Sequence, residues 1–459
     1  MSETPVREDG LPGGGFLFNI NFVFVTTLVS NTAGFFVAIL LARALGPDGR
    51  GVTALYQAAV SLGYAFLSLG VGSAAFYFVA RREISGRQAM EAGLSITLAS
   101  AIISAIAVLI ATVFFGDQLA DKPMPFWLAI ITVPAVIQLR LLESLLRAEG
   151  RFGAMNALEL SLPLTMLLVL GGVELAVGLT VPRAVWAWSL AFLPSWLFGY
   201  LLVGTSFWPR GLAPLSLLLK SLRFGGQGQL ANLIQLLNYR LDAFLILIFV
   251  NTAGVGLYSV ATSQTEGLWI IANSVAIVLL TNITSGDADN AARVTPVVCR
   301  NTLLVTAAGA LGAAFLAPIF ISITFGTDYE GAVAPYLWLL PGTVALSGAK
   351  ILAAYVFSRG RPIINAWIAL ATLIITIPTD ILLIHLFGVT GAAMGASFGY
   401  CLSLVLTAIA YQRLSGNSIL EALLPRPSDV VLYLDGLRSL LSRLHLVRRR
   451  AGDQPLGHP

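Results

Sequence analysis

Three basic residues lie inside long apolar stretches, where a charge is costly and usually serves a cavity or pairs with a partner. They are Arg140, Arg240 and Lys350. Arg140 lies eleven residues before Arg151. Lys350 lies eleven before Arg361, so a repeated arrangement would place one cation at the same depth in each half of the chain. Two facing cations could hold a polyanion, because a guanidinium binds in a bidentate way and an ammonium acts as a point charge.

A structural role is open for each of these cations. Glu143 follows Arg140 at helical spacing and could neutralise it, and the long arginine stem could reach the cytoplasmic interface. Lys350 has no acidic residue within four positions. Arg240, near the middle of its apolar segment, is the third candidate for an anionic group.

Acidic residues inside apolar segments predict a second kind of chemistry, ion coupling. Asp242 and Asp380 lie at similar distances from the outer ends of their segments, so they could share a cation or a proton. Thr376, one turn before Asp380, and Ser397 could add oxygen ligands of the kind that hard cations such as Na⁺ prefer. The alternative is that the carboxylates are counter-ions of the buried cations. Glu266 suits a proton carrier or a counter-ion equally well.

Uncharged polar residues mark the helix faces that could line a cavity. The apolar segment that begins at 229 carries the main stripe: its polar side chains lie within about 60° of one direction if the segment is a helix with 100° per residue. A lesser stripe, Thr27 and Asn31, lies in the first segment. Such stripes more often line a wet cavity than face lipid, although hydrogen bonding between helices is an alternative. The residues of the main stripe are Asn232, Gln235, Asn238, Tyr239 and Asp242.

The elements that hold these residues are membrane-spanning helices. The chain is 57% hydrophobic and 11% charged, with a mean hydropathy of +0.84, whereas soluble domains are about 25% charged. Windows of about 20 residues predict twelve spans. We expect a cytoplasmic N-terminus at 1–15, six spans in 16–208, a polar linker at 209–228, six spans in 229–411 and a basic cytoplasmic tail at 412–459.

The two sets of six spans match weakly as an internal repeat. Arg50-Gly51-Val52 resembles Val255-Gly256-Leu257, and the stretch 148–151 resembles 358–361. Because each set has an even number of spans, the repeat is parallel, with its pseudo-twofold axis along the membrane normal. The predicted fold is an all-α membrane protein with two six-helix lobes that face one another, a design suited to alternating access.

Basic residues also predict the orientation of the chain. With the N-terminus inside, twenty of the 27 lysines and arginines fall on the inner side and four, including Arg50, on the outer side. Both termini are therefore expected in the cytoplasm. This bias explains the net charge of +4 without nucleic-acid binding. The stretch 428–450 predicts a basic amphipathic helix that docks on anionic lipids or on a protein partner.

Other residues argue against an enzyme. The two cysteines, Cys299 and Cys401, have no spacing for a metal cluster, and the three histidines stand apart from polar clusters. The predicted outer loops are short, which leaves no room for the catalytic domain of a membrane-bound glycan polymerase or ligase. We therefore expect a transporter with no cofactor beyond a coupling ion; a purely structural membrane scaffold is the remaining class.

Several runs of sequence resemble the Wzx-type polysaccharide flippases of the multidrug/oligosaccharidyl-lipid/polysaccharide exporter superfamily. The similarity extends over 16–411, and the order and spacing of the runs strengthen it. The runs are LARALGPDGRG at 41–51, YRLDAFL at 239–245, VGLYSVA at 255–261, Phe325-Gly326 with Tyr329, and GVTGAA at 388–393.

The resemblance implies a monomeric flippase in the bacterial cytoplasmic membrane that moves a polyprenyl-pyrophosphate-linked oligosaccharide to the outer leaflet. It makes the three buried cations candidates for the pyrophosphate head group and implies glycan polymerase or assembly proteins as partners. Lipid II flippases are similar in having a sodium site among the helices that carry Asp242 and Asp380. The main alternative is a MATE-type multidrug/cation antiporter, whose cavity would be expected to be acidic and aromatic.

Overall fold

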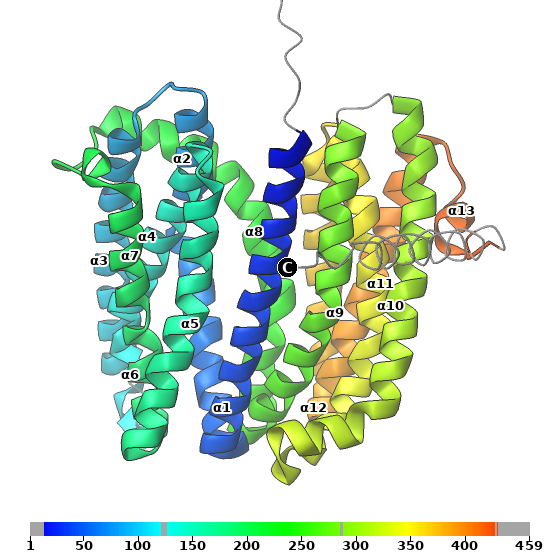
Figure 1. Ribbon diagram of the computed structural model, residues 1–459. Coiled ribbons are helices and arrows are strands. Elements are labelled where there is room, and N and C mark those ends of the chain that lie inside the picture. The colour runs from blue at the N-terminus through cyan, green and yellow to red at the C-terminus, as the bar shows by residue number, and fades with distance from the viewer. Residues whose placement is uncertain (1–12, 121–125, 285–287, 427–428, 430–459) are drawn as a thin grey trace, which may run out of the picture. The chain divides into compact units, whose positions relative to one another are not determined.

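The protein is helical, and the part of the chain that its structure describes contains no strand (Figure 1). This structure is a computed structural model that describes residues 13–120, 126–284, 288–426 and 429. The all-α class predicted from the composition is confirmed. Most of the predicted amphipathic helix over 428–450 lies outside the described residues, as does most of the N-terminal stretch 1–15.

Thirteen α-helices and three short 3₁₀ turns make up the described chain. The first seven helices are α1 (Gly13–Leu67), α2 (Val71–Ala80), α3 (Gly86–Ala120), α4 (Ala129–Ala148), α5 (Phe152–Val177), α6 (Val181–Leu190) and α7 (Phe192–Val203). The others are α8 (Leu215–Phe249), α9 (Thr252–Thr284), α10 (Ala288–Phe325), α11 (Val333–Ser358), α12 (Pro362–Ser415) and α13 (Ile419–Leu423). The 3₁₀ turns are η1 (Phe126–Leu128), η2 (Thr205–Phe207) and η3 (Thr327–Ala332).

Large apolar side chains on the outside of the helices face a lipid-like solvent. Among the described residues, nine stretches are long and apolar enough to cross a membrane. Leu175 is 90% exposed, Phe315 86% and Leu201 75%. Exposure of such side chains in water would cost about 25 cal/mol for each Å² of apolar surface. The protein is an integral membrane protein whose helices expose their apolar sides to the hydrocarbon.

The two longest helices, α1 and α12, are each two helices joined at a glycine. Gly46 has φ 67° and Gly388 has φ 57°, values in a region that a Cβ disfavours. Pro47 supports the first bend, because the residue before a proline avoids the helical region and a proline has no N–H for the helix. Both bends lie where windowed hydropathy separates one predicted span from the next, at 43–51 and at 388–389. The total of twelve spans and the side of the membrane on which the termini lie stay predictions.

The stretch predicted as an inter-lobe linker is largely helical. α8 begins at Leu215, so about two thirds of 209–228 belongs to the same continuous helix as the predicted seventh span. Windowed hydropathy missed this because Lys220 and Arg223 interrupt the apolar run without interrupting the helix. The chain can therefore leave one set of spans and enter the next through a rigid element.

The chain divides into two compact units. The first comprises the chain up to Gly267 with Phe315–Leu340 and Ala369–Gly399, and the second comprises Leu268–Ala314, Pro341–Ile368 and the chain from Tyr400. In the first unit, Leu141, Leu142 and Met90 are fully buried in a core formed by α2, α3, α4, α5 and α7. The core of the second unit centres on the aromatic pair Tyr355 and Tyr411, whose rings lie 4.9 Å apart.

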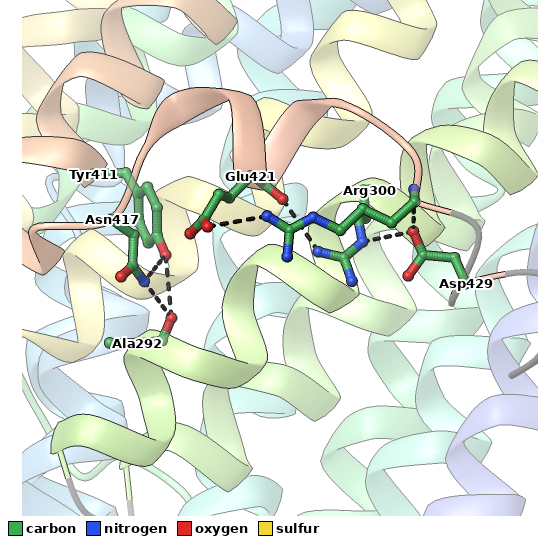
Figure 2. A network of polar contacts seen from close by, with 7 residues as sticks. Ala292, Arg300, Tyr411, Asn417, Glu421 and Asp429 are labelled. Carbon is green, nitrogen blue, oxygen red and sulfur yellow. Dashed lines mark hydrogen bonds and ion pairs between the residues drawn. The ribbon is translucent and has the colours of Figure 1, made fainter.

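A buried ion pair ties the segment after α12 to α10 within the second unit (Figure 2). Arg300 Nε donates to Asp429 Oδ2 at 2.6 Å, and the side chains are 6% and 1% exposed. Arg300 Nη1 also donates to the carbonyl oxygen of Glu421. Arg426 completes the network, with its backbone N–H on Asp429 and its guanidinium on Glu421.

Asn417, which lies two residues after the end of α12, makes a second contact between this segment and α10. Its Nδ2 donates to the carbonyl oxygen of Ala292 at 2.6 Å and to the hydroxyl of Tyr411 at 2.9 Å (Figure 2). Ala292 and Tyr411 both belong to the core of the second unit. Asn417 and Asp429 therefore contact α10 at two sites, Ala292 and Arg300.

Candidate functional site

Two buried carboxylates meet between α8 and α12 in the first unit. Asp242 is 3% exposed and Asp380 is 1% exposed. The hydroxyl of Tyr258 donates to Asp242 Oδ2 at 2.5 Å, and the carboxyl groups of Asp242 and Asp380 lie within hydrogen-bonding reach of each other. Two such groups cannot both remain charged without a cation or a proton between them. The pairing predicted from their depth is thus formed.

Two glycines make room for this pair on the second half of α12. A Cβ at Gly395 would lie 1.8 Å from Asp380 Oδ1, and a Cβ at Gly399 would lie 2.6 Å from Thr376 Oγ1. The glycines therefore let the two halves of α12 pack with these oxygen atoms between them. Asp380 Oδ1 and Thr376 Oγ1 are buried and have no hydrogen-bond partner. Orphaned oxygen atoms beside a carboxylate pair suit a hard cation such as Na⁺.

Ser397, the other predicted oxygen ligand, is engaged elsewhere. Its hydroxyl donates to the carbonyl oxygen of Trp338 within the first unit. The hydroxyl proton is therefore used in linking α12 to α11.

Arg240 and Glu266 form an ion pair between α8 and α9. Arg240 Nη2 and Glu266 Oε1 are 3.3 Å apart. Of the two roles left open for Glu266, its geometry here is that of a counter-ion. Asp242 and Asp380, which the sequence also allowed as counter-ions, form no ion pair with Arg240 in this structure.

Arg50 is a buried cation that sequence reasoning placed in an outer loop. It is 6% exposed, its Nε and Nη1 have no hydrogen-bond partner, and it lies close enough to Arg240, Glu266 and Tyr329 to interact with them electrostatically. Arg240 Nε also has no partner. Two guanidinium groups thus share one carboxylate, so the cluster has a surplus positive charge and three unused donors.

Close backbone contacts hold Arg50 in place. A Cβ at Gly51 would lie 1.9 Å from the carbonyl oxygen of Thr252, and a Cβ at Gly256 would lie 1.9 Å from that of Pro47. Asp48 accepts a hydrogen bond from the Thr252 hydroxyl at 3.0 Å. The bend of α1 and the start of α9 therefore touch through their backbones, which buries the residue beside Gly51. The repeat match at Gly51 and Gly256 was the sequence signal that could have identified Arg50.

The two remaining predicted cations have partners of their own. Lys350 Nζ donates to Asn273 Oδ1 at 2.9 Å and lies 4.6 Å from the ring centroid of Trp269, in the second unit. Arg140 pairs with Glu143 at 2.8 Å, which is the local neutralisation that the sequence allowed. That Arg140 and Lys350 face one another stays a prediction.

Hydrogen bonding between helices, one of the two uses predicted for the polar stripe on α8, is present in the structure. Asn238 donates to the carbonyl oxygens of Ile234 and Ala369, so part of the stripe bonds between helices. Gln235 hydrogen-bonds to Tyr239, and Asn232 is exposed. In α1, Asn31 is exposed, and the side chain of Thr27 lies outside the described part of the structure. Their role in lining a cavity stays a prediction.

Comparison with known proteins places this fold. A family model described as "Polysaccharide biosynthesis protein" matches residues 16–281, more than half of the chain. No curated protein sequence matches. The structure is similar to the lipid II flippase MurJ in an inward closed conformation, with a TM-score of 0.70, 15% identity, and coverage of 94% of this chain and 99% of that one.

Multidrug transporters have the same fold. An inward-facing MATE transporter of the MOP superfamily matches with a TM-score of 0.68 and 15% identity, covering 85% of this chain and 96% of that one. The Vibrio cholerae MATE transporter VcmN in the bent form matches with a TM-score of 0.53 and 16% identity, covering 88% and 98%. At such identities the likeness concerns the fold alone. Together with the family match, it confirms the resemblance read from the sequence: the chain belongs to the polysaccharide biosynthesis protein family and has the fold of the MOP exporter superfamily.

Proposed function

We propose that this flippase-type transporter moves a polyprenyl-(pyro)phosphate-linked oligosaccharide from the inner to the outer leaflet of a bacterial cytoplasmic membrane. The family match over residues 16–281 carries the proposal, because the family is described by polysaccharide biosynthesis. The similarity to a lipid II flippase agrees with a lipid-linked sugar as substrate. Glycan polymerase and assembly proteins are then the partners on either side of the transport step, and one chain suffices for transport.

The cationic cluster provides an anchor for the head group. Arg50 and Arg240 have three buried N–H donors without partners, and among the described residues one carboxylate, that of Glu266, balances their two charges. A pyrophosphate would supply both the acceptors and the negative charge that this cluster lacks. Lys350 and Arg140 are the next candidates, and each would exchange its present partner, Asn273 or Glu143, for the substrate.

The carboxylate pair provides a site for energy coupling. Asp242, Asp380 and Thr376 offer buried oxygen atoms, two of them without partners, to one Na⁺ ion or to a shared proton. Binding of either would remove the repulsion between the carboxylates and tighten the packing of α8 against α12. A cation gradient could thereby bias the two lobes, 16–208 and 229–411, between inward and outward access.

A MATE-type antiporter is the second candidate, favoured by the fold shared with solved MATE transporters. The surplus of positive charge at Arg50 and Arg240 argues against a cationic drug as substrate, because like charges repel in a site of low dielectric constant. The two functions differ in the sign of the cargo, which makes them separable by experiment.

Reconstitution into liposomes tests the proposal. The wild type should translocate a fluorescent polyprenyl-pyrophosphate-linked sugar, and Lys350→Ala and Arg50→Ala should lower the rate. Arg183→Ala is the control, because Arg183 is an exposed residue of α6 whose guanidinium donates to backbone carbonyls at the end of α5. Efflux of cationic drugs without sugar translocation would refute the flippase. Unchanged flipping in a variant would remove that residue from the substrate site.

A further inference from the structure

The first turns of α8 expose a face that mixes cations with apolar side chains. Leu215 is 68% exposed, Leu219 56% and Phe224 38%. Lys220 and Arg223 are exposed on the same face, at spacings of three and four residues. A helix face of this composition is typical of the membrane interface, where apolar groups meet acyl chains and cations meet phosphates.

The opposite side of this segment is fixed to the rest of the first unit. A Cβ at Gly225 would lie 2.4 Å from the carbonyl oxygen of Gly70, and a Cβ at Gly70 would lie 2.2 Å from that of Gly225. Gly70 has φ 72° and directly precedes α2. The backbones of α8 and of the turn before α2 are therefore in direct contact, so the exposed face is presented rigidly.

An aromatic floor lies beside this face. Phe224 stacks on Tyr77 with a centroid distance of 4.3 Å and an interplanar angle of 26°, and it lies 5.2 Å from Phe78. Lys220 Nζ sits 4.3 Å above the Phe78 ring. The aromatic side chains and the exposed face of α8 border a pocket of about 520 Å³ that is open to the surroundings. Its lining residues are Phe78, Ser216, Leu219, Lys220, Arg223 and Phe224.

The charges around the pocket are unbalanced. Glu83 accepts ion pairs from Lys220 at 2.9 Å and from Arg81 at 3.1 Å, so one carboxylate serves two cations. Arg223 has no ion pair in the described part of the chain and no hydrogen bond there from its guanidinium. An anion at the pocket would meet Arg223 and Lys220 together, with the Ser216 hydroxyl as a further donor.

We propose that this pocket binds an anionic glycerophospholipid of the inner leaflet. Arg223, Lys220 and Ser216 would hold the phosphate, and Leu219 and Phe224 would contact the first acyl carbons. The pocket lies among the lysines and arginines that predict the cytoplasmic side, where basic clusters bind anionic lipids. It shares no residue with the carboxylate pair or with the Arg50 cluster, so the inference does not depend on the proposed substrate.

Native mass spectrometry of the full-length protein in a neutral detergent tests the site. Phosphatidylglycerol should bind more tightly than phosphatidylcholine with the same acyl chains. Arg223→Gln should weaken phosphatidylglycerol binding about fivefold, since one cation near the phosphate contributes about that factor. Arg210→Gln, which removes the same charge from an exposed residue outside the pocket, should leave binding unchanged.

Two further binding measurements distinguish a phospholipid from a soluble phosphate as the ligand of this pocket. Glycerol phosphate should compete only weakly, and Leu219→Gln should weaken phosphatidylglycerol but not glycerol phosphate, because the acyl contact is then lost. Equal binding of the two phospholipids, or equal effects of Arg223→Gln and Arg210→Gln, would overturn the proposal. Preference for undecaprenyl phosphate over phosphatidylglycerol would also overturn it, because the pocket would then be an entry point for the substrate carrier.

Discussion

Gly51 and Gly256 make equivalent backbone contacts with each other's helices. A Cβ at Gly51 would lie 1.9 Å from the carbonyl oxygen of Thr252, four residues before Gly256. A Cβ at Gly256 would lie 1.9 Å from the carbonyl oxygen of Pro47, four residues before Gly51. Pro47 and Thr252 are separated in the chain by the same number of residues as Gly51 and Gly256. A contact that maps onto itself in this way is what a twofold axis through the internal repeat produces.

We predict that Gly256→Ala impairs both stability and transport. The added methyl would collide with backbone, which cannot rotate away, so overpacking should cost about 1–3 kcal/mol of unfolding free energy. Thermal unfolding and the liposome assay measure the two effects. Gly267→Ala in the same helix, where a Cβ meets nothing within 4 Å, is the matched control. Equal behaviour of the two variants would show that the contact is unimportant.

Asp380→Asn should uncouple transport from the ion gradient. The amide keeps the shape of the carboxyl group but cannot supply the negative charge that a shared cation or proton requires. Flipping rates with imposed Na⁺ or pH gradients measure this, and the gradient that accelerates the wild type identifies the ion. Asp328→Asn, an exposed acidic residue in η3, should keep the response. A gradient response retained by Asp380→Asn would exclude this carboxylate from coupling.

Arg50→Met should raise stability while it lowers transport. A buried guanidinium with two unpartnered N–H groups is destabilising, so a side chain of similar length and no charge should gain about 1 kcal/mol. Loss of the anion anchor should at the same time slow flipping about tenfold or more. Chemical or thermal unfolding and the liposome assay measure the opposite changes. A variant less stable than the wild type would indicate that the charge is compensated.

Arg300→Ala should destabilise the second unit. Removal of one partner leaves Asp429 buried without its cation, which costs about 3–5 kcal/mol for pairs of this kind. Thermal unfolding of the purified protein checks this, with Arg413→Ala, an exposed arginine at the end of α12, as the control. A cost no larger than that of the control would mean that this ion pair is not formed in the purified protein.

The same ion pair predicts a pH dependence. Hydrogen bonds from Arg300 and from the backbone of Arg426 lower the pKa of Asp429 below its usual 3.8. Its contribution to stability is therefore complete above pH 3.8 and is lost as the pH falls through the lowered pKa of the folded protein. The difference in unfolding midpoint between the wild type and Asp429→Asn should be constant near neutral pH and shrink in acid. A difference that grows on acidification would contradict this assignment.

The sequence predicted the class of fold and the loops in which Gly46 and Gly388 lie, because hydropathy is a property of each stretch of chain by itself. It also placed Asp242 and Asp380 at similar depth, because the rise per residue of a helix is constant. It did not predict the burial of Arg50, which depends on α1 and α9 approaching through Gly51 and Gly256. Nor did it assign Glu266 to Arg240, since a pair between two helices depends on their relative rotation, which spacing within one helix does not define.

The contacts of Asp429 also define where the chain can be shortened or labelled. A protein that ends at Arg426 would lack the carboxylate on Arg300 and leave that guanidinium buried beside a single backbone carbonyl. A protein that ends just beyond Asp429 would keep the ion pair. Truncations for crystallisation, and fluorescent reporters fused to the C-terminal side, should therefore begin after this residue.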